Sequence, residues 1–93
     1  MIIGALQVKL FIPEAQSLKE KRFVLKSILT RIRSRFNVSV SEIDGQVLWQ
    51  SSLIGVVAVG NEQRHVNEVL SKVTDFLREG RNFEVIDSKL EFL

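Results

Sequence analysis

Several residue types are scarce in this chain, which has no cysteine, no tyrosine, and only one proline, one tryptophan and one histidine. The absence of cysteine excludes disulfides, thiolate metal sites, iron–sulfur clusters and a cysteine nucleophile. No apolar run approaches the roughly 18 residues that a membrane-spanning helix needs. The apolar start is interrupted by Gln7 and Lys9 and does not resemble a signal peptide, so we expect a cytoplasmic protein without a membrane partner.

Residues for catalysis are also sparse. The single histidine, His65, has no serine and aspartate at a spacing that would suggest a triad, and no pair of carboxylates is spaced for acid–base chemistry. The glycines are isolated, so no phosphate-binding loop is predicted, and no cluster of metal ligands is present. We therefore expect a non-enzymatic protein with no cofactor, metal or small-molecule substrate. An enzyme would require a buried, convergent polar pocket.

Hydrophobic periodicity predicts six elements. Alternating or continuous apolar segments indicate four strands, at Ile2–Ile12, Asn37–Ile43, Leu53–Val59 and Phe83–Leu93. Two segments with helical periodicity indicate helices, at Ser17–Phe36 and Asn61–Gly80. We expect Ser17 and Glu20 to form a capping box, Asn37 to end the first helix in a left-handed conformation, and Asn61 to cap the second helix.

The order β-α-β-β-α-β predicts an α+β, ferredoxin-like fold in a single domain, residues 1–93. Right-handed crossovers place both helices on one face of a four-stranded antiparallel sheet with strand order 4-1-3-2. The other face is then open, and the last strand is an edge. We expect that strand to present Val85, Asp87, Lys89 and Glu91 on the open face.

The predicted first helix is strongly basic. Between Ser17 and Phe36 the chain has seven Lys or Arg residues and one Glu, a net charge of +6, whereas the whole chain carries only +2. At 100° per residue the cations flank the apolar stripe on two sides: Lys19, Arg22, Lys26 and Arg33 on one, and Lys21, Arg31 and Arg35 on the other. A cationic row of this length predicts binding to the phosphates of structured RNA or of a ribosomal precursor. The alternative is a solvated face whose long side chains cover apolar edges.

A second interpretation concerns the open sheet face and the connection before the third strand. Phe11, Leu48 and Trp49 are apolar residues predicted to lie there, and tryptophan is enriched at interfaces. These residues predict a protein-interaction module, such as a homo-oligomer. Single-stranded RNA recognition on this face is disfavoured, because the third strand offers no aromatic residue for base stacking.

Two motifs in combination, SLKEKR (Ser17–Arg22) and LWQ (Leu48–Gln50), resemble the YlxP-like family of small bacterial proteins. The resemblance also includes FIPEA before the first motif and RFNVSVSE between the two, and it extends over essentially the whole chain. It implies a ferredoxin-like fold and a group without an established biochemical activity. It also implies a gene neighbourhood of transcription, translation-initiation and ribosome-maturation factors, which favours an RNA or ribosome role.

Overall fold

A computed structural model describes all 93 residues and contains the six expected elements. In chain order they are β1 (Ile2–Phe11), α1 (Leu18–Arg35), β2 (Ser39–Asp44), β3 (Ser51–Gly60), α2 (Gln63–Arg78) and β4 (Glu84–Phe92).

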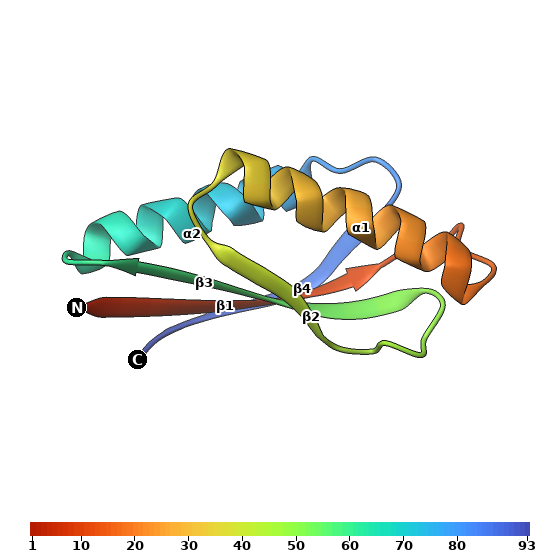
Figure 1. Cartoon of the computed structure of the whole chain (residues 1–93), viewed down its shortest axis with the longest axis horizontal. Coiled ribbons are helices and arrows are strands. Elements are labelled where there is room, and N and C mark those ends of the chain that lie inside the picture. The colour runs from red at the N-terminus through yellow and green to blue at the C-terminus, as the bar shows by residue number, and fades with distance from the viewer.

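The four strands form one antiparallel sheet in the order β2-β3-β1-β4, and both helices cover the same face of it (Figure 1). This is the predicted order 4-1-3-2, so the ferredoxin-like α+β fold is confirmed. The two central strands are the most apolar ones, as expected for strands with a neighbour on each side.

The core lies between the sheet and the helices. Alternate residues of β1, including Leu6, Val8 and Leu10, point toward the helices and are fully or almost fully buried. They belong to one cluster of 17 buried apolar residues, to which both helices and all strands except β4 contribute. The intervening residues of β1 face away from the helices, which leaves the second face of the sheet uncovered (Figure 1).

The capping predictions are only partly confirmed. Ser17 Oγ accepts a hydrogen bond from the Glu20 amide at 3.1 Å, as predicted, while Glu20 Oε2 accepts from Ser17 Oγ and from the Gln16 amide. The left-handed stop at Asn37 is wrong, because only Gly45 has a positive φ. The cap at Asn61 is also wrong, since α2 begins one residue later, after Glu62, without a side-chain cap.

A β-bulge changes which residues of β4 face the helices. The pairing of β1 with β4 shifts between Lys9 and Leu10, so that Leu10 lies opposite Val85. Residues directly opposite one another in a sheet point to the same face, and Leu10 is a core residue. The placement of Val85 on the open face is therefore wrong, because Val85 packs against the core.

Two side chains of α2 pack directly over Gly4 of β1. A Cβ atom on Gly4 would lie 2.6 Å from Val66 Cγ1 and 2.7 Å from Leu70 Cδ1, which is too short for any real contact. We therefore expect Gly4→Ala to reduce the free energy of unfolding by about 1–3 kcal/mol through overpacking, as measured by urea denaturation. The control is Ser71→Ala at an exposed position of α2, which should change stability by less than about 0.5 kcal/mol. Equal stability of Gly4→Ala and the parent would contradict this packing.

Candidate nucleic-acid interface

Lys21 does not lie on the exposed flank predicted for it. Its side chain is only 1% exposed, and it occupies the buried stripe of α1 together with Leu25, Ile28 and Ile32. Its ammonium group lies 2.8 Å from Glu42 Oε2 and also donates a hydrogen bond to the Gly45 carbonyl oxygen. Lys21 is therefore an internal structural residue, and its predicted contact with nucleic acid is wrong.

The partner of Lys21 is held by a further side chain. Glu42 lies on β2, and the same carboxylate oxygen accepts a hydrogen bond from Ser52 Oγ of β3 at 2.7 Å. Ser52 is also buried. A buried charge is tolerated only when it is paired and hydrogen-bonded, and this small network satisfies both conditions. It connects α1 to two strands and to the connection that follows β2.

Four of the predicted cations are exposed and free of acidic partners. Lys19, Arg22, Lys26 and Arg31 all lie on the solvent side of α1. The Lys21–Glu42 contact is the only ion pair within 4.0 Å in the chain. These four positive charges are therefore not neutralised by neighbouring carboxylates within that distance.

The remaining two cations are exposed but partly engaged. Arg33 donates from Nη2 to the Val40 carbonyl oxygen of β2 at 3.0 Å. The Arg35 guanidinium carbon lies 4.9 Å from the ring centroid of Phe76 on α2, which is a cation–π distance. Both contacts attach the C-terminal half of α1 to its neighbours. Of the four unengaged cations, Lys19, Arg22 and Lys26 lie in the N-terminal half of α1, and only Arg31 lies in the C-terminal half.

Phe23 is a surface residue that the sequence analysis missed. Its side chain is 80% exposed, although it belongs to a helix with a well-formed buried stripe. It lies four residues after Lys19 and three before Lys26, so the three side chains share one face of α1. The signal was present in the sequence, since a large aromatic residue opposite the apolar stripe has no core to pack into.

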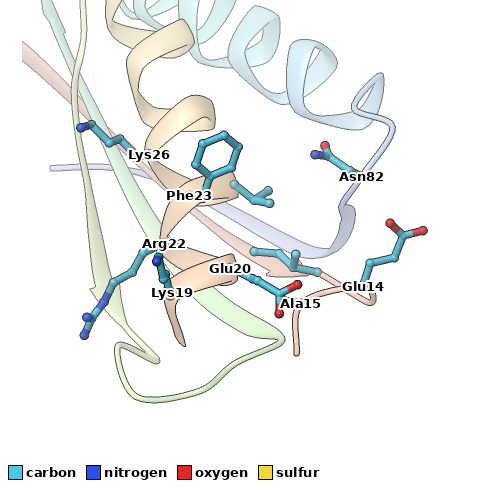
Figure 2. Close-up of a pocket in the computed structure, with 10 residues that line it drawn as sticks. Glu14, Ala15, Lys19, Glu20, Arg22, Phe23, Lys26 and Asn82 are labelled. Carbon is cyan, nitrogen blue, oxygen red and sulfur yellow. The ribbon is translucent and has the colours of Figure 1, made fainter. Parts of the chain in front are cut away.

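A groove of about 600 Å³ lies beside Phe23. Its walls come from α1, from the connection after β1 and from the connection before β4, and its lining residues are Ile12, Glu14, Ala15, Lys19, Glu20, Arg22, Phe23, Val24, Lys26 and Asn82. Figure 2 shows Arg22 and Lys26 extending to one side of α1, Asn82 and Glu14 on the other side, and the Phe23 ring between them.

The predicted partner-binding residues also come together. Phe11, Leu48 and Trp49 line one open hollow with Gln50 and Ser51. Leu48 and Trp49 are about half exposed, at 51% and 55%. At the opposite end of the same strands, β3 exposes Val57 and Val59 on the open sheet face. The structure thus has two candidate surfaces, one on α1 and one on the uncovered side of the sheet.

Two further observations bear on other functions. None of the helices is both long enough and apolar enough to span a membrane. No group of three or more histidine, aspartate or glutamate side chains is arranged to hold a metal ion.

Comparison with known proteins places this architecture in a family. Residues 3–90 match the family described as "Protein of unknown function (DUF503)". The chain belongs to this family. It is also 43% identical over 76 residues to "Uncharacterized protein YlxP" of Bacillus subtilis (strain 168), and the match covers 82% of this chain and 83% of the relative. The YlxP-like resemblance is thereby confirmed.

The structure gives physical roles to the two motifs that resemble this DUF503 family. Within SLKEKR, Ser17 and Glu20 cap α1, and Lys21 is the buried cation. Within LWQ, Gln50 Nε2 donates to the carbonyl oxygens of Pro13 and Ala15, at 2.9 and 3.1 Å. Both motifs therefore support the same region, the connection that leads from β1 into α1.

The buried ion pair of this DUF503 protein predicts a large stability effect. In Lys21→Met, the Glu42 carboxylate, whose side chain is 16% exposed, loses its cation and keeps the hydrogen bond from Ser52. We therefore expect the free energy of unfolding to fall by about 3 kcal/mol in urea denaturation, the lower end of the range for a fully buried pair. Lys19→Met is the matched control and should change stability by less than about 0.5 kcal/mol. The double variant Lys21→Met, Glu42→Met should recover part of the loss, because no unpaired charge remains. An equal, small effect of both single variants would contradict the buried pair.

Proposed function

We propose that this protein binds structured RNA or a ribosomal precursor through the exposed face of α1, without catalysis and in the cytoplasm. Lys19, Arg22 and Lys26 contact phosphates, while Arg31, Arg33 and Arg35 assist where the RNA follows the helix further. The observation that carries the proposal is the exposure of these cations without a carboxylate within 4.0 Å. Cations left unpaired in this way are available to replace the counterions of a polyanion.

The geometry of the helix supports this assignment. Lys19 and Lys26 are seven residues apart, which is about 10.5 Å along the axis of α1, and Arg33 continues the row for a similar distance. The partial positive charge at the N-terminus of α1 adds to the potential on the same half. Glu20 is the one acidic residue of the helix, and its carboxylate is engaged in the N-terminal cap.

The proposal predicts a salt-dependent interaction that is sensitive to charge on α1. If three phosphates are neutralised on an RNA duplex, the affinity should fall with salt at a log–log slope near about −2.7, using the value for B-DNA. The double variant Arg22→Glu, Lys26→Glu should bind a ribosomal RNA hairpin at least about 10-fold more weakly in fluorescence anisotropy at 100 mM salt.

The matched control reverses two exposed cations on the other helix, Arg64→Glu and Lys72→Glu, and so makes the same change in net charge. It should lose much less affinity. An equal loss in the two double variants would indicate a net-charge effect without a site on α1. Unchanged affinity in the α1 variant would refute the proposal.

A second candidate function is self-association through the open sheet face. An uncharged strip lies at one end of the two central strands. It consists of two adjacent cross-strand pairs, Ile3 with Val59 and Ala5 with Val57. Val59 is 59% exposed. A two-fold contact brings a patch against its own copy, so an uncharged apolar patch can meet itself without placing like charges together. The occupant that fits this face is a second copy of the chain.

Self-association predicts a concentration-dependent dimer in sedimentation velocity. Val59→Lys should shift the dimer dissociation constant upward by at least about 10-fold, because it introduces a charge into the contact. Phe23→Lys makes the same chemical change on α1, on the opposite side of the molecule, and should leave the dimer unchanged. A parent protein that sediments as a monomer at all concentrations would refute this candidate.

A further inference from the structure

We propose that the groove beside Phe23 binds an unpaired base of the RNA chain whose phosphates lie along Lys19 and Lys26. This inference rests on the proposed function and specifies its ligand. The chemical class is a nucleotide in a single-stranded segment, such as a loop or bulge, whose base can leave the stack.

The first step of the argument is the position of the ring. Phe23 is 80% exposed and lies between two cations on one helix face, Lys19 one turn before it and Lys26 one turn after it. An exposed aromatic ring beside cations is the arrangement by which proteins hold single-stranded nucleic acid, with the base stacked on the ring and the backbone on the charges. Packing of the core does not explain an aromatic residue at position 23, because Phe23 is not part of the buried stripe of α1.

The second step is the space next to the ring. The groove has a volume of about 600 Å³, which lies within the usual range of roughly 300–1,000 Å³ for small-molecule sites. Its apolar lining, Ile12, Ala15 and Val24, suits the face and rim of a heterocyclic base. Asn82 lies on the far side of the ring from Arg22 and Lys26 (Figure 2). Its carboxamide has both a donor and an acceptor, which matches the edge of any base.

The third step is the distribution of charge around the groove. The groove is lined by three cations and two carboxylates. The cations are Lys19, Arg22 and Lys26, and the carboxylates are Glu14 and Glu20. Glu20 is directed to the N-terminal cap by its hydrogen bonds to Gln16 and Ser17. Arg22 and Lys26 extend on the side of α1 away from Glu14 (Figure 2). A chain with its phosphates on the cation side and its base over Phe23 therefore keeps the phosphates away from Glu14.

These features together favour an unpaired nucleotide over a regular duplex. In a duplex every base is stacked and paired, so the cations can contact phosphates but the ring finds no free base. Phosphate contacts alone would make affinity depend only on charge. A contribution from stacking adds a preference for single-stranded segments, and this preference is what distinguishes the inference from the proposed function.

The experiment uses a tryptophan reporter. In a Phe23→Trp, Trp49→Phe variant the only tryptophan is at position 23, and stacking of a base quenches its emission. The probes are a single-stranded 10-nucleotide RNA, the blunt 10-base-pair duplex, an abasic ribose-phosphate oligomer of equal length, and free AMP. We expect quenching by the single-stranded RNA and little quenching by the other three at equal concentration.

Affinity measurements on the protein without the tryptophan reporter at position 23 complete the test. Phe23→Leu keeps an apolar side chain but removes the aromatic face, and it should weaken binding of the single-stranded RNA by about 5-fold or more. Phe23→Tyr should retain binding, and duplex binding should be the same in all three proteins. Because the Phe23 side chain is exposed, these variants are expected to fold. Ile86 on β4 is also exposed, and Ile86→Ala is the control for a loss of apolar surface outside the groove.

The outcomes separate this inference from the proposed function. If Phe23→Leu binds single-stranded RNA like the parent, while Arg22→Glu, Lys26→Glu loses affinity, the base site is refuted and the phosphate site is retained. Quenching by AMP equal to that by the RNA would refute the RNA chain as ligand in favour of a free nucleotide. If the parent binds none of the nucleic acids, both proposals fail together.

Discussion

The ammonium group of Lys21 is withdrawn from water and held by Glu42 and by the carbonyl oxygen of Gly45. Two parts of the chain that are distant in sequence meet at this group: the first turn of α1, and the edge strand β2 with the connection that follows it. Removing a charge from water is costly unless its partners are placed correctly, so the pair tolerates little variation in how α1 lies on the sheet. The orientation of the helix, and with it the direction in which the other cations project, depends on this contact.

The two sides of the molecule have different chemistry as a result. The helical side presents free cations with an aromatic ring among them. The sheet side presents an uncharged apolar strip at one end of the central strands, and Leu48 and Trp49 lie at the other end. Because the two surfaces lie on opposite sides, occupation of one does not block the other. A dimer formed through the sheets would carry two basic helices on its outer surfaces, and such a pair would increase the apparent affinity for a long polyanion.

Most of the fold could be predicted from the sequence, since the strand order follows from alternating patterns, helical spacing and right-handed crossovers. The errors arose where local periodicity does not determine the outcome. Val85 faces the core because a bulge adds a residue to β4, and no pattern within that strand encodes the shift. Lys21 was assigned to the surface because of its charge, although its spacing from Leu25 and Ile28 already placed it in the buried stripe.

The candidate site was predicted less completely for a related reason. The cations of α1 could be identified from composition, and Lys19, Arg22, Lys26 and Arg31 lie on the solvent side as expected. The groove depends on two connections that approach α1 only in the folded chain, so Ile12 and Asn82 could not be associated with Phe23 from spacing alone. Likewise, the partners of Arg33 and Arg35 are on β2 and α2, far away in sequence.

The pairing of β1 with both β3 and β4 has a consequence for how the chain is made. Strand β1 is synthesised first but occupies a central position in the sheet. One of its two neighbours, β4, is synthesised last. Until β4 arrives, β1 exposes a row of unpaired backbone groups beside an apolar face, which is a template for intermolecular strand addition. Nascent or C-terminally truncated chains should therefore be the aggregation-prone form of this protein.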